Sequence, residues 1–329
     1  MTVERLAIIG GGAWGTALAQ VVAAGGRDTL LWAREPEVVD AINATRENSV
    51  FLPGRKLDPA IRATTDLAEA GDADAWLVVT PAQHMRSVLE GTPNCARPMI
   101  LCSKGIEERS GQLLHDVARA ACPNAQVAVL SGPTFAHEVA AGLPTAVTLA
   151  TGDAPLGESL RRRIALPSFR VYLSDDIIGA EIGGAVKNVL AIACGVVEGK
   201  GLGQNAGAAL IARGFAEMTR FGLDCGARRE TLVGLSGLGD LVLTCSSTSS
   251  RNFSLGKGIG EGRSAEELLA DRRTVAEGAF TAPVLARLAA ERGVDMPIVA
   301  AVDGLLAGRI SVDAVLEQLL ARPPRPESH

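Results

Sequence analysis

The sequence has few aromatic residues and no excess of basic ones. Aromatic residues make up 3% of the 329 residues, and the net charge is −5 with a pI near 5.5. Nucleic-acid surfaces are usually basic and stack bases on aromatic rings, so this composition argues against a nucleic-acid partner. We therefore expect the partners of this chain to be small molecules.

Cysteine and histidine are sparse and scattered. The six cysteines include no C-x-x-C pair, and the four histidines include no H-E-x-x-H spacing. The sequence therefore predicts no metal site. Scattered cysteines suit a reducing cytoplasm, where each acts as a small hydrophobic residue, so we expect a cytoplasmic protein.

The chain also lacks a convincing targeting or membrane segment. Residues 6–26 are uncharged, which is long enough to imitate a signal peptide or a membrane span. Glycines at positions 10, 11, 12 and 15 divide this stretch into a strand and a helix. We therefore predict no targeting segment and no membrane insertion.

A glycine-rich turn follows the first apolar run. Residues 5–9 lead into Gly10-Gly11-Gly12-Ala13-Trp14-Gly15 and then into a helical run over 16–24. In a dinucleotide-binding G-x-G-x-x-G turn, Gly10 permits the tight bend, Gly12 admits the pyrophosphate, and Gly15 packs the helix on the strand. The alternative is a purely structural glycine turn, but the strand–turn–helix context favours a dinucleotide site.

The next strand, 29–32, has no acid at its end. An acid at this position usually binds the adenosine ribose of NAD. Here the chain continues Ala33-Arg34-Glu35, and Arg34 could pair with the 2′-phosphate of NADP. We therefore expect NADP(H) or NAD(H) as cofactor, with NADP somewhat favoured; the alternative is a solvent-exposed loop arginine.

Strand and helix patterns alternate up to about residue 176, and only helical patterns follow. This predicts an α/β protein with an N-terminal Rossmann-type doubly wound sheet and a C-terminal all-helical domain. We place the boundary within 174–179, giving a dinucleotide-binding domain over 1–178 and a substrate-binding domain over 179–329. Residues 322–329 read as a polar, disordered tail. The further strands are expected at 75–80, 98–103, 126–130, 146–151 and 169–173.

One lysine lies in a helical stretch made mostly of small apolar residues. Lys187 interrupts EIGGAVKNVLAIA, residues 181–193, and its helical neighbours include Gly183 and Gly184. Burial there would lower its pKa because desolvation disfavours the ammonium. We expect a functional lysine with both glycines providing clearance for a ligand; the alternative is a lysine that reaches solvent or pairs with an acid.

Other polar residues occur where ligands usually bind. Lys104 follows the strand at 98–103, and Ser131-Gly132-Pro133-Thr134-Phe135-Ala136 follows the strand at 126–130. A serine- and glycine-rich segment, 234–252, is expected to be a loop that could hold a phosphate. The alternative is an ordinary interhelical loop with capping serines.

Taken together, the motifs resemble one family. GGGAWGTALA, FLPG, SKG, SGPTFAHEVAAGLPTA, GGAVKNVLAI, GLGDLVLTC, SRN and VAEG occur in this order over nearly the whole chain. The sequence is similar to bacterial NAD(P)-dependent sn-glycerol-3-phosphate dehydrogenases. The resemblance implies an oxidoreductase that reduces dihydroxyacetone phosphate to sn-glycerol 3-phosphate for glycerophospholipid synthesis. It also suggests a homodimer.

The resemblance assigns site residues by matching position. Lys187 becomes the general acid/base, and Gly207 is a local departure because many relatives carry arginine or lysine there. Substrate contacts are expected at Lys104, Gly132, Thr134, Lys187, Asp240, Ser250, Arg251 and Asn252. Cofactor contacts are expected at Gly10, Gly12, Ala13, Trp14, Gly15, Arg34, Lys104, Ala136, Arg251, Val275 and Glu277.

These roles agree with the chemistry of carbonyl reduction. Hydride delivery leaves negative charge on oxygen, so the reaction needs a neighbouring cation that can donate a proton. Lys187 can do both, and Asp240 could orient it. Two alternatives remain open: another Rossmann-plus-helical reductase, of the β-hydroxyacid dehydrogenase or ketopantoate reductase type, and a non-catalytic nucleotide sensor.

Overall fold

The computed structural model describes residues 5–92, 95–270 and 276–321. Its N-terminal part contains one eight-stranded sheet in the order β3-β2-β1-β4-β5-β6-β7-β8. Every neighbouring pair is parallel except β6 and β7, which are antiparallel. The strands are β1 (Arg5–Ile9), β2 (Asp28–Trp32), β3 (Ile61–Thr64), β4 (Ala75–Val78), β5 (Met99–Leu101), β6 (Val127–Ser131), β7 (Thr145–Ala150) and β8 (Phe169–Ser174).

Helices cover both faces of the central part of this sheet, so strands such as β1, β4 and β6 are buried on both sides, whereas the edge strand β8 has exposed residues. In β1, Leu6 and Ile8 join the core that includes α1, while Ala7 and Ile9 join the opposite core that includes α3 and α4. This is the expected consequence of alternating side chains in a strand that is buried on two faces. The helices of this part are α1 (Ala13–Ala24), α2 (Pro36–Thr45), α3 (Met85–Glu90), α4 (Leu114–Ala121), α5 (Ala136–Ala140) and α6 (Ala154–Ile164).

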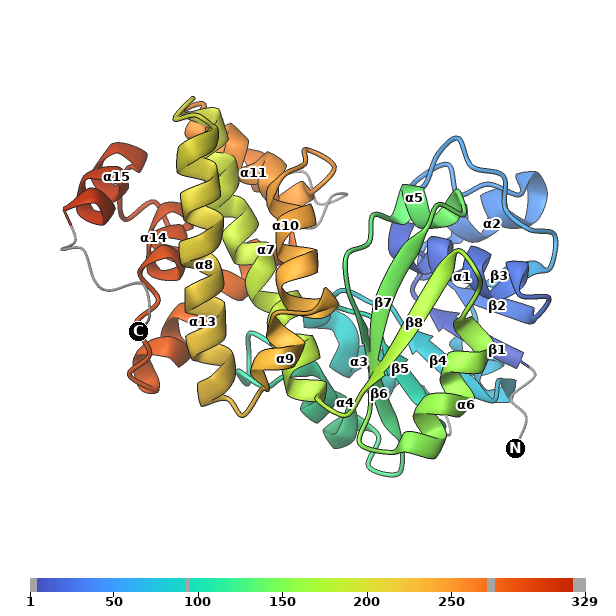
Figure 1. The fold of residues 1–329 in the computed structure, drawn as a ribbon. Coiled ribbons are helices and arrows are strands. Elements are labelled where there is room, and N and C mark those ends of the chain that lie inside the picture. The colour runs from blue at the N-terminus through green and yellow to red at the C-terminus, as the bar shows by residue number, and fades with distance from the viewer. Residues whose placement is uncertain (1–4, 93–94, 271–275, 322–329) are drawn as a thin grey trace.

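The strand–helix alternation ends between β8 and α7, and helices gather on the other side of the molecule (Figure 1). A third hydrophobic core holds this part together. Its helices are α7 (Ile177–Gly199), α8 (Gln204–Asp224), α9 (Arg229–Leu232), a π-helix η3 (Leu235–Gly239), α10 (Asp240–Cys245), α11 (Arg251–Gly260), α12 (Ala265–Leu269), α13 (Glu277–Glu291), α14 (Pro297–Leu306) and α15 (Val312–Leu320).

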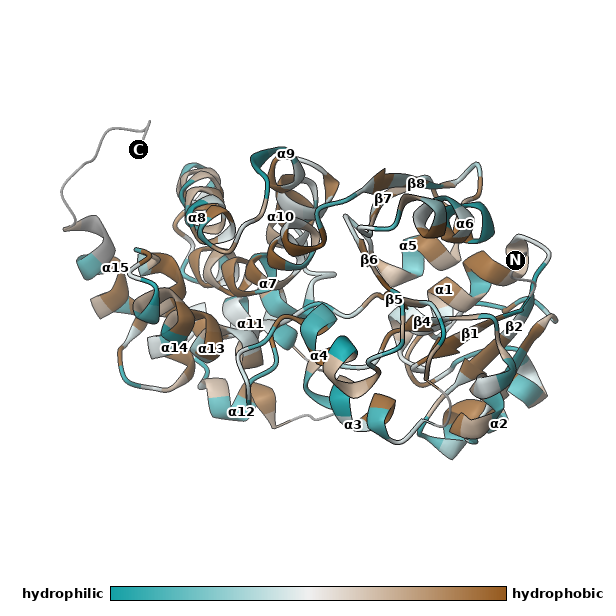
Figure 2. Cartoon of the chain, turned by 90° about the horizontal axis from the view of Figure 1, so that it is seen from below, coloured by the Kyte–Doolittle hydropathy of each residue, from teal (hydrophilic) through white to brown (hydrophobic). Residues whose placement is uncertain are grey.

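Helix α7 is the centre of the helical part. Every residue from 179 to 196 is buried, and Figure 2 shows α7 enclosed by α8, α10 and α11. Among the described residues it is the one helix long and apolar enough to span a membrane, yet 89% of its most apolar window is buried inside the protein. Its hydrophobicity is therefore used for packing within the protein.

Glycines allow α7 and α11 to cross at close range. A Cβ atom at Gly195 would collide with the carbonyl oxygen of Phe253, and one at Gly256 would collide with that of Ile192. Side-chain size at the contact sets the distance between packed helices, so glycine on both sides brings the two backbones together. The glycine run at 256–260 therefore has a packing role.

The sheet-and-helix prediction is confirmed, with two corrections. Strand β3 was not predicted, because IRAT is a short edge strand without a long apolar run. Segment 234–252 is not one loop: η3 and α10 occupy much of it, and α11 begins at Arg251. Tertiary packing against α7 supports helices that the glycines and serines disfavour. The predicted disordered tail, 322–329, lies outside the described residues.

The expectation of unpaired cysteines is wrong for one pair. Cys95, which precedes β5, and Cys122, which ends α4, form a disulfide with Cα atoms 5.7 Å apart. They are 27 residues apart in sequence, so only the return of the chain to the end of α4 brings them together. The free cysteines are Cys102, Cys194, Cys225 and Cys245.

Candidate active site

Lys187 projects from the buried face of α7 toward α10. Its Nζ donates hydrogen bonds to Asp240 Oδ1 and Thr244 Oγ1, each at 2.8 Å. Asp240 and Thr244 are four residues apart, so one turn of α10 presents both oxygens to the lysine. The Lys187 side chain is 7% exposed and that of Asp240 is fully buried. The lysine is therefore a buried, hydrogen-bonded cation with a fixed orientation.

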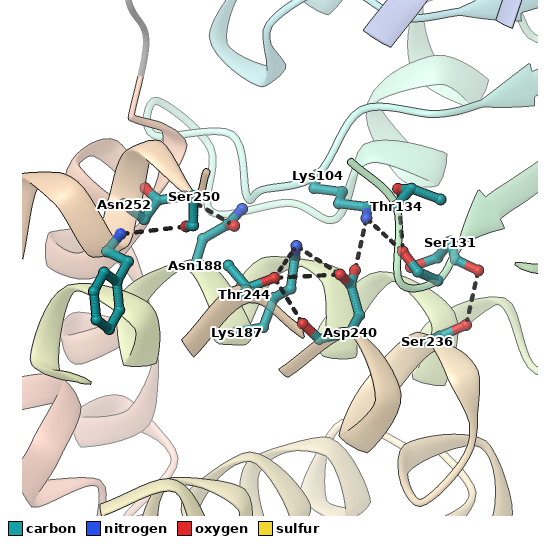
Figure 3. Close-up of polar contacts among 12 residues, drawn as sticks. Lys104, Ser131, Thr134, Lys187, Asn188, Ser236, Asp240, Thr244, Ser250 and Asn252 are labelled. Atoms are coloured by element: carbon teal, nitrogen blue, oxygen red, sulfur yellow. Dashed lines mark hydrogen bonds and ion pairs between the residues drawn. The ribbon is translucent and has the colours of Figure 1, made fainter. Parts of the chain in front are cut away.

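A second lysine binds the same carboxylate from the sheet side. Lys104 follows β5, and its Nζ lies 2.6 Å from Asp240 Oδ2 and 3.0 Å from the carbonyl oxygen of Gly132. Gly132 follows β6 and has φ of +154°, a conformation that favours glycine. Figure 3 shows Lys104 and Lys187 on the two sides of Asp240. Two cations sharing one carboxylate leave a local excess of positive charge.

The burial of Lys187 changes its acidity. Its pKa is lowered from 10.5 to about 8, chiefly by burial; the charge of Lys104 acts in the same direction, while Asp240 opposes both effects. A lysine with a pKa near 8 can exchange a proton close to neutral pH. The predicted effect of burial on this pKa is therefore confirmed.

The predicted ligand clearance at Gly183 and Gly184 is wrong. A Cβ atom at Gly183 would collide with the carbonyl oxygen of Ser236 in η3. One at Gly184 would lie 3.2 Å from Lys104 Cγ and from Ser131 Oγ. These glycines let η3 and Lys104 approach α7, and thereby build the lysine cluster.

The predicted phosphate-binding residues lie at the start of α11. Ser250 Oγ accepts the backbone N–H of Phe253 and caps the helix. Asn252 Nδ2 donates to Asn188 Oδ1 at 3.0 Å, which connects α11 to the residue after Lys187. Arg251 is exposed. The hydrogen bond between Asn252 and Asn188 thus holds the predicted phosphate-binding residues beside the lysine cluster.

Two polar residues of this region were not predicted as site residues. Thr244 contacts the lysine directly, and Asn188 holds Asn252. Sequence offered one usable signal for each: Asn188 is adjacent to Lys187, and Thr244 is four residues after Asp240 on a helix. The spacing between Asp240 and Thr244 is informative only in a helix, and the sequence of 234–252 indicates a loop.

The glycine turn between β1 and α1 has room for a dinucleotide. A Cβ atom at Gly10 would lie 2.8 Å from Val79 O, and one at Gly15 would collide with Gly10 O, so both positions require glycine. Gly12 faces open space, and it precedes the N-terminus of α1. Backbone amides at a helix N-terminus favour phosphate. The residues present therefore fit the pyrophosphate of a dinucleotide.

Two of the residues predicted to contact the cofactor carry buried polar atoms that lack partners among the described residues: Trp14 Nε1 in the turn and Glu277 Oε2 in α13. Glu277 begins α13, and its other oxygen accepts the backbone N–H of Ala82 at 3.2 Å. Burial raises the pKa of Glu277 to about 7.

The other predicted cofactor contacts lie as follows. Ala13 is partly buried at the start of α1, and Ala136 starts α5. Val275, another predicted cofactor contact, lies outside the described residues.

Arg34 lies just beyond β2, as predicted. Its side chain is 74% exposed and pairs with Glu35 through contacts of 2.9 and 3.1 Å. Thr134, predicted for the substrate, donates from Oγ1 to Gly132 O at 3.3 Å. Arg34 therefore lies just beyond the end of β2, where the adenosine ribose is expected to bind. Thr134 lies near Lys104, because both side chains donate to Gly132 O.

The strand order from β3 to β6 and the glycine turn are those of a dinucleotide-binding domain, and the buried lysine cluster holds a group whose pKa of about 8 suits proton exchange. The class defined by fold and site is a two-part nicotinamide-dependent oxidoreductase. Two family models match: the N-terminal model of NAD-dependent glycerol-3-phosphate dehydrogenase over residues 5–156 and the C-terminal model over 176–317. The chain belongs to the NAD-dependent glycerol-3-phosphate dehydrogenase family.

Individual relatives agree with this assignment. The chain is 64% identical over 327 residues to glycerol-3-phosphate dehydrogenase [NAD(P)+] of Erythrobacter litoralis, covering 99% of this chain and 98% of the relative. It is 56% identical to that of Caulobacter vibrioides, covering 100% of each. The crystal structure of glycerol-3-phosphate dehydrogenase from Coxiella burnetii is 37% identical, with a TM-score of 0.93 over 98% of this chain and 100% of that one.

Proposed function

We propose that this protein is an NAD(P)-dependent sn-glycerol-3-phosphate dehydrogenase that reversibly reduces dihydroxyacetone phosphate. The observation that carries the proposal is the buried cluster of Lys187, Asp240 and Lys104, formed where the helical part meets the carboxyl ends of β5 and β6. In such sheets ligands bind beyond the carboxyl ends of the strands. The named activity of the relatives above supports the same assignment.

The nicotinamide ring, when bound, supplies the hydride. Lys187 Nζ donates a proton to the oxygen that becomes the C2 hydroxyl, and it accepts that proton in the reverse direction. Lys104 adds positive charge that stabilises the developing alkoxide. Asp240 holds both ammonium groups in place, and Thr244 completes the orientation of Lys187.

The substrate phosphate is assigned to the start of α11. Ser250, Arg251 and Asn252 would bind it, with the helix N-terminus contributing its backbone amides. Gly132 and Thr134 would face the substrate from the sheet side. Binding a group remote from the reacting carbon positions that carbon for hydride transfer.

The two parts of the chain would bind different ligands. Residues 1–178 would bind most of the cofactor and residues 179–329 most of the substrate. Gly10, Gly12, Ala13, Trp14 and Gly15 would hold the pyrophosphate region, Arg34 a 2′-phosphate, and Lys104, Ala136, Arg251, Val275 and Glu277 the remainder of the cofactor. We further propose a cytoplasmic homodimer that supplies glycerophospholipid synthesis.

The main alternative is a related reductase of another specificity. A ketopantoate reductase from Ralstonia eutropha shares the fold, with a TM-score of 0.62 at 16% identity, and this likeness concerns fold alone. Such an enzyme has no need of the Ser250-Arg251-Asn252 phosphate site. A nucleotide sensor would have no need of a lysine held between Asp240 and Thr244.

The direct test is an assay of the purified full-length protein. We expect NADPH absorbance to fall when dihydroxyacetone phosphate is added, and NADPH to form when sn-glycerol 3-phosphate is given with NADP. Ketopantoate and β-hydroxyacids serve as competing substrates. Turnover of one of these with none of dihydroxyacetone phosphate would contradict the proposal.

A further inference from the structure

Buried polar atoms without partners mark places where a ligand can complete the structure. Leaving a buried donor or acceptor unpaired is costly, so native proteins retain few of them. Outside the arginine side chains, the atoms of this kind within the described residues are Trp14 Nε1, Thr80 Oγ1, Ser131 Oγ and Glu277 Oε2. Trp14 and Thr80 follow β1 and β4, Ser131 ends β6, and Glu277 begins α13. Trp14 and Glu277 are already assigned to the cofactor, whereas Thr80 has no assigned role.

Thr80 lies at the point where the strand order reverses. The sheet order places β1 between β2 and β4, and Ile9 pairs with Val78, so Gly10 and Thr80 leave neighbouring strands at the same level. A Cβ atom at Gly10 would lie 3.1 Å from Thr80 N. Dinucleotides bind in the crevice at this reversal. Thr80 therefore borders the predicted path of the cofactor.

The backbone carbonyl of Thr80 accepts a hydrogen bond, but its hydroxyl has no partner among the described residues. Ser103 Oγ donates to Thr80 O at 2.5 Å. Two residues further on, Ala82 N donates to Glu277 Oε1, whose partner oxygen Oε2 is also without a hydrogen bond among the described residues. Thr80 is only 4% exposed, so bulk water does not satisfy its hydroxyl. Two unpartnered oxygens are thus carried by Thr80 and by the glutamate that bonds to Ala82, two residues after Thr80.

We infer that the Thr80 hydroxyl binds the ribose of the nicotinamide half of the cofactor. The assignment to that half follows from the sheet: Arg34 follows β2 on the adenosine side, the glycine turn follows β1 at the pyrophosphate, and β4 lies on the opposite side of β1. A hydroxyl can donate to or accept from a ribose hydroxyl. The inference rests on the proposed function, because it requires a nicotinamide dinucleotide.

The test compares Thr80→Val with a hydroxyl that already has a partner. Valine keeps the shape of threonine and removes the hydroxyl. Thr29 provides the matched control: it is fully buried near the amino end of β2, and its Oγ1 donates to Arg27 O at 3.0 Å. Thr80→Ser keeps the hydroxyl and should preserve cofactor affinity.

The readouts are the melting temperature without ligand and the dissociation constants for NADPH and for adenosine 2′,5′-bisphosphate, which lacks the nicotinamide half. Thr80→Val should leave the ligand-free melting temperature unchanged or raised. It should weaken NADPH binding roughly fivefold to tenfold, the size of one net hydrogen bond, and leave the bisphosphate unaffected. Thr29→Val should lower the melting temperature and leave both affinities unchanged.

The possible failures can be told apart. A wild-type protein that binds neither NADPH nor NADH would overturn the proposed function and this inference with it. A wild-type protein that binds NADPH, beside a Thr80→Val variant of equal affinity, would overturn the inference alone. So would a Thr80→Val variant that loses thermal stability as Thr29→Val does, or that loses affinity for the bisphosphate as well.

Discussion

The two sides of the candidate site differ in how their polar atoms are satisfied. On the cofactor side, Trp14 Nε1, Thr80 Oγ1 and Glu277 Oε2 are buried without partners among the described residues. On the substrate side, Lys187 and Lys104 both bond to Asp240, and the unpartnered atom found there among the described residues is Ser131 Oγ. The cofactor side therefore has atoms that a bound ligand would satisfy, whereas Lys187 is already oriented by side chains of the protein.

This difference separates binding from chemistry. Residues with unpartnered atoms should affect cofactor affinity, because the ligand supplies their missing bonds. Residues of the lysine cluster should affect turnover and its pH dependence, because their bonds set the position and acidity of Lys187. Substitutions on the two sides should therefore have different effects, on cofactor affinity in one case and on turnover in the other.

The largest expected effect is that of Lys187→Ala. Removing the proton donor should lower turnover about 10³-fold while leaving NADPH affinity largely intact. The measurements are steady-state turnover and a NADPH fluorescence titration. Lys200→Met is the control, because Lys200 follows α7 and forms a surface ion pair with Asp313, away from the lysine cluster. Undiminished turnover in Lys187→Ala would remove this lysine from the mechanism.

Asp240→Asn should change the pH profile as well as the rate. Reduction needs the protonated form of Lys187, so wild-type activity in that direction should fall as pH rises through about 8. Without the carboxylate, which raises this pKa, the fall should move to lower pH, and turnover should drop about 10²-fold. Asp303→Asn, which disturbs the exposed pairing with Arg309, is the control. An unshifted profile would contradict the coupling.

Two buried glutamates give a matched pair. Burial raises the pKa of both Glu217 and Glu277 to about 7. Glu217 accepts the backbone N–H groups of Ile298 and Val299 with its two oxygens, whereas Glu277 uses one. We expect Glu277→Gln to weaken NADPH binding about tenfold or more with little loss of thermal stability. Glu217→Ala should cost about 1–3 kcal/mol of stability and leave cofactor affinity unchanged.

The pH dependence of thermal stability gives a further test of the buried carboxyl of Glu217. A carboxyl whose folded pKa lies above its unfolded value stabilises the fold most below the unfolded value of 4.5, and this contribution is lost as pH rises through about 7. The advantage of wild type over Glu217→Gln should therefore shrink between pH 4.5 and 7 in thermal melts. A difference that grows with pH would mean that the buried carboxylate is stabilised in its charged form.

The smallest expected effect concerns cofactor choice. Arg34 is largely exposed, so its contact with a 2′-phosphate is partly screened by solvent. Arg34→Ala should weaken NADPH several-fold to about tenfold and NADH much less, as measured by titration with each cofactor. Arg5→Ala, at the opposite end of β1, should affect neither. Equal losses for NADPH and NADH would refute the 2′-phosphate contact.

Local sequence was sufficient for most of the sheet and for the lysine. The apolar run at 5–9 became β1, because a strand buried on both faces must be apolar along most of its length. The run at 169–173 became β8 at the edge of the sheet, where Arg170 and Tyr172 are exposed. Lys187 stood out because small apolar neighbours surround it on one helix. Strand β3 carries no such run, and its pairing with β2 decides its conformation.

The composition and motifs alone determined a dinucleotide-binding α/β protein with a helical second part and a buried lysine. The tertiary structure decided which residues surround that lysine. Asp240, Thr244 and Lys104 reach Lys187 from α10 and from the loop after β5, and Gly183 and Gly184 make those approaches possible by admitting η3 and Lys104. Such contacts depend on backbone approach between segments far apart in the chain, which no local spacing encodes.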